Sequence, residues 1–175
     1  MISRPNSGEF KPYFSRYIDL VPDGDLLALL QNQHRAMQQM LAPLTPEQAK
    51  HRYASGKWSI TEVIGHLGDT ERIFAYRALR FGRNDTTALP GFDENHYVPA
   101  GRFDERSLGD VAAEFATVRA GTLALFRGFG ADAFERSGSA DGKPITVRAL
   151  AYIIAGHEKH HIELLKSRYG VPAVA

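Results

Sequence analysis

Three histidines fall close together near the C-terminal end of the chain, in the segment Gly156-His157-Glu158-Lys159-His160-His161. His157 and His161 are four residues apart, and at 100° per residue they lie on one side of a helix, about 40° from each other. Two imidazoles in this arrangement can bind one metal ion, as they do in other helical metal sites. His160 lies about 60° from His157 on the other side. It is therefore the weaker candidate ligand. It could instead contact one of the metal ligands or lie on the surface.

Inward-facing histidines do not by themselves require a metal ion, because a single one is commonly a hydrogen-bonded core residue. Two neighbouring imidazoles in an apolar stripe are costlier, since a buried polar group without a partner destabilises the fold by about 1–3 kcal/mol. A shared metal ion satisfies both His157 and His161, so the pair favours a metal site. His66, on the flank of the apolar face of an earlier helix, supplies a third nitrogen. Three neutral imidazoles leave a coordination position open for water or substrate, as in catalytic sites.

Acidic residues near these histidines have two interpretations. Glu62 and Asp69 share one side of the helix with His66 and could orient its second ring nitrogen. Carboxylates on a solvated helix face explain them at least as well. Glu158 lies about 100° from His157 around the helix, which favours a surface position. No catalytic residue is assigned, and packing or loop positions are expected for the remaining histidines: His34, His51 and His96.

The elements that carry these residues are predicted to be four amphipathic helices. Caps, apolar periodicity and helix breakers place them from Leu26 to about residue 42, from Ser59 to about Phe81, from Leu108 to near Gly128 or Gly130, and from Thr146 to Gly170. No strand pattern is found, and Ser137 to Pro144 is expected to be a polar loop. Residues 83–106 are much longer than an ordinary helix connection. The sequence therefore predicts an all-α four-helix bundle with a long crossover connection.

Length and composition favour one domain. The chain has 175 residues, enough for a single buried core, and Pro5, Pro12 and Pro22 predict an N-terminal arm over residues 1–22 that covers a bundle domain of residues 23–175. The net charge of +1 gives no argument for a nucleic-acid partner. The absence of cysteine excludes disulfides and thiolate ligands and favours a cytoplasmic location. No apolar run suits a signal peptide or a membrane span.

Three segments resemble the DinB/YfiT-like family of metalloenzymes: residues 56–69 with Gly-Lys-Trp-Ser-Ile-Thr-Glu and Gly-His-Leu-Gly-Asp, the loop Gly91-Phe92-Asp93-Glu94, and residues 146–161. The resemblance covers about residues 23–169. It implies a four-helix bundle, often a homodimer, that holds a divalent metal ion, commonly zinc or nickel, on one histidine of the second helix and a His-x-x-x-His pair of the fourth. The matching positions here are His66, His157 and His161, and no other cofactor is implied.

The resemblance leaves the reaction open. Relatives include transferases that use bacillithiol, mycothiol or glutathione, so the leading hypothesis is transfer of a low-molecular-weight thiol to a small-molecule substrate. Because the chain has no cysteine, the thiol would be a cosubstrate. Hydrolysis of an amide or ester by metal-activated water is the alternative, and a stress-response metal-binding protein without turnover is a third. An open pocket beside the metal would favour an enzyme. We expect its walls to come from the arm and from the 83–106 loop, which carries Phe92, Asp93, Tyr97 and Phe103.

Overall fold

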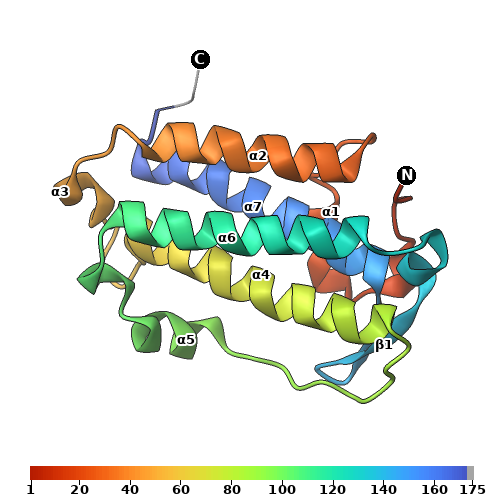
Figure 1. Cartoon of the computed structure of the whole chain (residues 1–175). Coiled ribbons are helices and arrows are strands. Elements are labelled where there is room, and N and C mark those ends of the chain that lie inside the picture. Colours follow the sequence, from red (N-terminus) through yellow and green to blue (C-terminus); the bar gives the residue numbers. More distant parts are fainter. Residues whose placement is uncertain (173–175) are drawn as a thin grey trace.

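The computed structural model describes residues 1–172, and most of them form a bundle of long helices (Figure 1). The four bundle helices are α2 (Leu26–Leu41), α4 (Ile60–Gly82), α6 (Leu108–Arg127) and α7 (Val147–Tyr169). Each begins after a polar residue whose side chain accepts a hydrogen bond from the first turn; these caps are Asp25, Ser59, Ser107 and Thr146. The four predicted helices are confirmed, with ends close to those expected.

The order of the helices explains the long connection. In Figure 1, α4 and α6 run in the same direction, whereas α2 and α7 run in the opposite one. Both α2 and α4 pack against α6 and α7, so α2 and α4 lie on a diagonal of the bundle. The chain after α4 must therefore travel back along the bundle before α6 can begin. This segment contains α5 (Glu94–Gly101) and η3 (Phe103–Glu105), and it is the predicted crossover. The shorter link from α2 to α4 contains α3 (Pro46–Ala49).

A β-hairpin occupies the connection between α6 and α7, where a polar loop was expected. After η4 (Ala131–Glu135), β1 (Ser137–Ala140) pairs antiparallel with β2 (Lys143–Thr146), and Ala140 lies opposite Lys143. The prediction of no strand was wrong here. Asp141 and Gly142 have φ values of 53° and 68°, the positive values that a type I′ hairpin turn requires. Leu89 of the crossover forms a bridge to Ala140, so the hairpin also holds the crossover in place.

The N-terminal arm is more deeply embedded than a cover would be. It forms η1 (Ser7–Glu9), η2 (Pro12–Phe14) and α1 (Ser15–Ile18), and α1 packs against α7. Tyr17, Ile18 and Val21 are buried in the main apolar cluster. The physical reason is that α7 is buried all round from Ala149 to Glu158, so its outer face also needs a partner. The division into an arm and a domain of residues 23–175 stays a prediction, and residues 173–175 lie outside the described residues.

The core consists of two apolar clusters with a polar layer between them. The first cluster includes Leu67 of α4 and Leu165 of α7, and the second includes Phe74 of α4 and Ala155 of α7. These four residues border the gap between the two clusters. Six buried polar residues of the two helices lie in or beside the gap: His66, Thr70, Glu71, His157, Glu158 and His161. Two further buried polar residues of α4, Thr61 and Arg77, lie outside it. Within residues 1–172, no helix combines the length and the apolar character needed to cross a membrane.

Candidate metal centre

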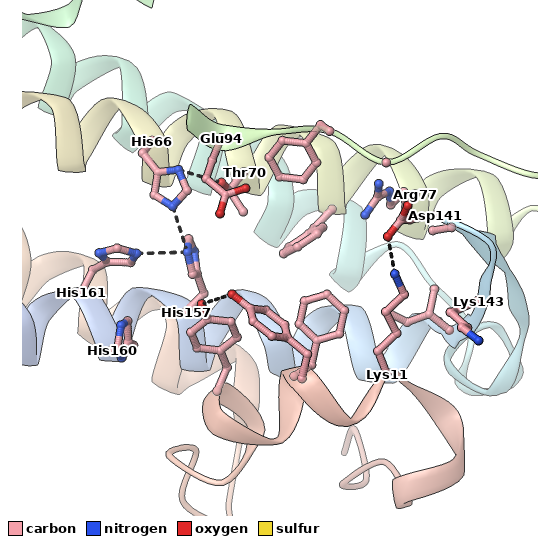
Figure 2. A pocket seen from close by; sticks show the side chains of 18 of the residues that line it. Lys11, His66, Thr70, Arg77, Glu94, Asp141, Lys143, His157, His160 and His161 are labelled. Atoms are coloured by element: carbon pink, nitrogen blue, oxygen red, sulfur yellow. Dashed lines mark hydrogen bonds and ion pairs between the residues drawn. The ribbon is translucent and has the colours of Figure 1, made fainter. Parts of the chain in front are cut away.

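Three histidines meet in this polar layer, His66 from α4 and His157 and His161 from α7 (Figure 2). His157 Nε2 lies 3.1 Å from His66 Nε2 and 3.1 Å from His161 Nε2. Each side chain is buried, with 7% of its surface exposed. The structure thus brings together the three histidines that the sequence singled out.

The donor set of this cluster fits a divalent metal ion. A ring nitrogen carries either one proton or one lone pair, so His157 Nε2 cannot form two good hydrogen bonds to two other ring nitrogens. A shared cation would accept one lone pair from each ring. Zinc–nitrogen bonds of 2.0–2.1 Å in a tetrahedral site separate neighbouring nitrogens by about 3.3 Å, close to the 3.1 Å found here.

Burial keeps these imidazoles neutral. It lowers the pKa of His66 to about 4. The pKa values of His157 and His161 are held well below their usual range, first by burial and then by neighbouring histidines. A neutral imidazole has a free lone pair, so all three rings are in the protonation state that a metal ligand needs.

The second nitrogen of His66 faces a hydroxyl group and neither of the two carboxylates that could have oriented it. His66 Nδ1 lies 3.4 Å from Thr70 Oγ1, one turn further along α4. With its proton on Nδ1, His66 donates to Thr70 and leaves Nε2 free. Asp69 instead pairs with Arg72 at 3.1 Å, and Glu62 belongs to a cluster at the start of α4. Of the two interpretations of these carboxylates, the structure does not show the orienting role.

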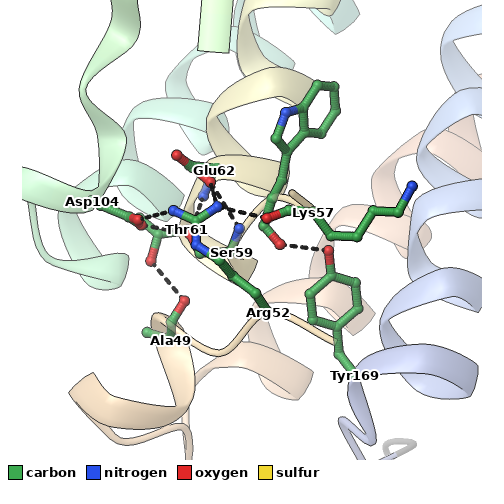
Figure 3. Close-up of polar contacts among 9 residues, drawn as sticks. Ala49, Arg52, Lys57, Ser59, Thr61, Glu62, Asp104 and Tyr169 are labelled. Carbon is green, nitrogen blue, oxygen red and sulfur yellow. Dashed lines mark hydrogen bonds and ion pairs between the residues drawn. The ribbon is translucent and has the colours of Figure 1, made fainter. Parts of the chain in front are cut away.

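The polar cluster around Glu62 fixes the beginning of α4 (Figure 3). Ser59 caps the helix by accepting from the Glu62 backbone at 3.1 Å, and the Glu62 carboxylate accepts from the Ser59 backbone at 2.8 Å. Arg52 donates to the same carboxylate and, at 2.6 Å, to Asp104 of the crossover. Ser59 Oγ also donates to Asp104. The cluster ties three chain segments together just before the turn that carries His66.

Two aromatic rings cover the histidines. Trp58 precedes the cap of α4, and its ring centroid lies 4.7 Å from that of His66. The Tyr169 hydroxyl donates to the Trp58 carbonyl at 2.7 Å, as Figure 3 shows, and so ties this segment to α7. From the arm, Tyr17 makes an edge-to-face contact with His157 at 5.2 Å. These rings exclude water from two sides of the cluster.

Glu158 is buried, although the helical angle favoured the surface. Its carboxylate is paired with Arg119 of α6 at 2.7 Å, and Arg119 also donates to Glu71 of α4 at 2.6 Å and to the Leu30 carbonyl at 2.8 Å. Burial raises the pKa of Glu158 to about 7 despite the nearby guanidinium. The four bundle helices are therefore tied together by one arginine, directly beside the histidines.

An open pocket of about 550 Å³ reaches the three histidines and extends away from them toward the hairpin (Figure 2). The arm contributes to its wall, as predicted, and so does the start of the crossover. The wall residues from outside the bundle helices are Lys11, Tyr13, Phe14, Tyr17, Trp58, Gly91, Phe92, Glu94, Ala140, Asp141, Lys143, Pro144 and Ile145. Of the three aromatic residues that the 83–106 loop was expected to contribute to the wall, Phe92 lines the pocket. Phe103 is packed in the core instead, and Tyr97 contacts Phe92 from outside.

The remaining histidines lie outside the three-histidine cluster. His160 lines the pocket and contacts Tyr17, but its nitrogens do not join the cluster. His34 packs against Phe115 in the core, and His96 is exposed. Two further residues, Glu94 and Arg77, line the pocket, and neither was among the site residues predicted from the sequence.

Comparisons with known proteins agree with this architecture. A family model of the DinB superfamily matches residues 29–165. The structure of YfiT from Bacillus subtilis, described as a probable metal-dependent hydrolase with an unusual four-helix bundle topology, is similar over 95% of this chain and 97% of that chain, with a TM-score of 0.75 and 20% identity.

A mycothiol-dependent maleylpyruvate isomerase is also similar in structure. The match has a TM-score of 0.66 and 13% identity, and it covers 90% of this chain but 64% of the isomerase. A histidine-to-alanine mutant of a mycothiol-dependent maleylpyruvate isomerase matches with a TM-score of 0.64 and 14% identity. At these identities the likeness shows a common fold. No curated protein matches the chain.

Proposed function

The chain belongs to the DinB superfamily, and we propose that it is a divalent-metal-dependent enzyme that holds its metal ion on His66, His157 and His161. The observation that carries this proposal is the convergence of three Nε2 atoms on the wall of an open pocket. Within residues 1–172 the metal-competent cluster comprises these three side chains. A site with three protein ligands keeps a position for a reactant, whereas a structural site is commonly closed by a fourth.

The residues around the pocket have separate roles in this proposal. A bound zinc or nickel ion would lower the pKa of a coordinated water or thiol toward neutrality. The Thr70 hydroxyl would accept from a protonated Nδ1 of His66, the tautomer that leaves Nε2 free for the ion. Glu94 lines the same pocket, so its carboxylate is the candidate to accept a proton from the reactant. Tyr17 and Trp58 shield this proton transfer from bulk water.

Transfer of a low-molecular-weight thiol to an electrophilic small molecule is the reaction we propose first. The S–H bond of the thiol breaks and its proton passes to Glu94 or to water. The sulfur forms a bond to the electrophilic carbon, which either loses a leaving group with its bonding electron pair or, where the sulfur adds to a double bond, takes up a proton at the neighbouring carbon. The thiol is a cosubstrate, because the chain has no cysteine. A cavity of about 550 Å³ has room for a small substrate and the reactive part of a thiol. The similarity to a mycothiol-dependent isomerase supports this reaction class.

Hydrolysis is the second candidate, and the similarity to YfiT over nearly the full length of both chains favours it. Glu94 would then accept a proton from water instead of from a thiol. The open pocket argues against a metal-binding protein without turnover. A homodimer and a cytoplasmic location stay predictions.

Elemental analysis tests the metal site. Protein purified without a histidine tag should carry close to one equivalent of zinc or nickel, or take it up when the ion is added. His157→Ala and His161→Ala should lose it. His160→Ala is the matched control, because it removes an imidazole of the same helix that lies outside the cluster. A wild-type protein that binds neither ion would refute the proposal.

Two assays on the metal-loaded protein separate the reactions. One follows the loss of thiol from glutathione, bacillithiol or mycothiol in the presence of 1-chloro-2,4-dinitrobenzene, and the other follows the release of 4-nitrophenol from its esters. Thiol transfer predicts activity in the first assay that falls at least tenfold in His157→Ala and in Glu94→Gln. Ester cleavage without a thiol, lost in the same variants, would favour hydrolysis instead.

A further inference from the structure

The end of the pocket that lies away from the histidines is built around a buried arginine. Arg77 of α4 is 6% exposed and donates to the Pro90 carbonyl at 2.7 Å. Its guanidinium lies against two aromatic rings that contact each other, with 5.5 Å from Cζ to the centroid of Phe74 and 5.8 Å to that of Phe92. Among residues 1–172, no carboxylate lies within ion-pair distance of it. A guanidinium has five N–H groups, so most of its donors remain available to the pocket that Arg77 lines.

The other buried arginine, Arg119, makes a useful contrast. Arg119 is paired with two carboxylates, those of Glu71 and Glu158. A buried cation without an anionic partner is costly to the fold, and burial lowers the pKa of Arg77 accordingly. Asp141 at the hairpin turn acts on the charge of Arg77 but forms its ion pair with Lys11, so Arg77 has no direct carboxylate partner on the side that faces the cavity.

The charges around Arg77 leave this end of the pocket positive. Lys11 from the arm and Lys143 from β2 line the same region, and Figure 2 shows both on the hairpin side of the cavity. Asp141, at the hairpin turn, is the acidic residue among them, and it pairs with Lys11. Three cations facing one carboxylate attract an anion into the cavity.

Helix geometry connects the two ends. His66, Thr70 and Arg77 are separated by four and seven residues, so they lie along one face of α4, and the rise of a helix puts His66 and Arg77 about 16 Å apart along its axis. Between them the pocket is lined by aromatic rings, including Phe14, Phe74 and Phe92. The cavity thus has three zones: histidines, an aromatic middle and a cationic end.

We propose that the cationic end around Arg77 binds the carboxylate of an elongated, partly aromatic small molecule whose opposite end reaches the three histidines. The carboxylate supplies the missing partner of Arg77, and the aromatic middle binds the body of the molecule. Only the placement of the reactive end at the histidines rests on the proposed function. Binding of the carboxylate needs Arg77 and its neighbours, not a metal ion.

A matched pair of probes tests this subsite in metal-free protein. Binding of 4-phenylbutanoate and its neutral amide, 4-phenylbutanamide, is followed by the fluorescence of Trp58, the one tryptophan of the chain, which lines the pocket. The wild type should prefer the carboxylate by about tenfold or more, the range of a hydrogen bond to a charged group. In Arg77→Gln the preference should fall to about twofold, whereas Arg35→Gln, an exposed arginine of α2, should keep it.

Equal affinity of the wild type for both probes, or an undiminished preference in Arg77→Gln, would overturn the proposal. If Arg77→Gln does not fold, Lys143→Gln decides, because this side chain is exposed. It should weaken carboxylate binding about threefold and leave amide binding unchanged; no change in either would count against the subsite. Failure of metal binding alone would remove the proposed function and leave the carboxylate subsite standing.

Discussion

Arg119 Nη1 donates to Glu158 Oε2 at 2.7 Å in the centre of the bundle, one residue along α7 from His157. The same guanidinium reaches Glu71 of α4, which directly follows Thr70, the partner of His66. One buried cation therefore connects the two helices that carry the three histidines. We infer that this ion-pair network sets the spacing between α4 and α7, and with it the approach of the Nε2 atoms.

Replacement of Arg119 by methionine should be strongly destabilising. It leaves the carboxylates of Glu71 and Glu158 buried without a cation, and breaking a buried ion pair in this way costs about 3–5 kcal/mol. Urea unfolding of metal-free protein, followed by far-UV circular dichroism, measures the loss. Arg106→Met is the control: its ion pair with Glu114 is partly exposed, so its removal should cost less than about 1 kcal/mol. Similar losses in both variants would mean that the buried network contributes little to stability.

His34 should make the stability of the fold depend on pH. The pKa of His34 is lowered to about 4, mainly by burial and then by the nearby Arg119. The folded-state pKa lies below the unfolded value of 6.5, so the contribution of neutral His34 is present above pH 6.5 and is lost as the pH falls toward 4. Between about pH 7.5 and about pH 5, the wild type should lose about 2 kcal/mol more than His34→Leu.

Urea unfolding at a series of pH values provides this measurement, with chelator present to keep bound metal from contributing. His96→Leu, at an exposed position, should follow the pH dependence of the wild type. Parallel curves for the wild type and His34→Leu would show that His34 does not carry the effect.

The bundle and the histidine cluster could be predicted because their signals are local. Asp25, Ser59 and Thr146 are caps that precede regular apolar periodicity, and the spacing of His157 and His161 fixes their relative directions on a helix. The hairpin was missed because strands of four residues have too little alternation to detect. Its signal was the Asp141-Gly142 dipeptide, which favours a two-residue hairpin turn.

Side-chain partners across helices could not be predicted from angles alone. The surface position expected for Glu158 assumed that one face of α7 meets solvent. In the structure the arm packs on α7 from outside the bundle, and Arg119 of α6 pairs with Glu158 from within it. Arg77 shows the same limitation. Nothing local in the sequence marks it as a site residue, and the crossover and the hairpin make it part of the pocket wall.

Removal of the Ser59 hydroxyl should cost more than removal of an ordinary helix cap. Ser59 is fully buried, caps α4 and also donates to Asp104, so Ser59→Ala leaves that carboxylate with one partner fewer. We expect a loss of about 2 kcal/mol in urea unfolding, the upper end of the range for caps. Ser107→Ala removes the exposed cap of α6 and should cost about 1 kcal/mol or less. If Ser107→Ala costs as much as Ser59→Ala, the cluster in Figure 3 adds nothing beyond capping.

Two glycines of the bundle should respond in opposite ways to an added methyl group. A Cβ on Gly156 of α7 would lie 2.0 Å from the backbone oxygen of Tyr17, which cannot rotate away, so α1 would have to move. Gly156→Ala should therefore cost about 2–3 kcal/mol. Gly121 of α6 has open space around it, and Gly121→Ala should stabilise the helix by up to about 1 kcal/mol.

The Gly156 variant also tests whether the arm forms a wall of the pocket. The Tyr17 ring lies against His157 and His160, so a displaced α1 should open that side of the cavity and weaken the binding of 4-phenylbutanoate, read from Trp58 fluorescence. Gly121→Ala should leave binding unchanged, because α6 contributes no residue to this pocket in the described part of the chain. Unfolding measurements that place both variants within about 0.5 kcal/mol of the wild type would mean that α1 yields easily. In that case the arm would be a loose cover, and the pocket would owe its shape to the bundle, the crossover and the hairpin.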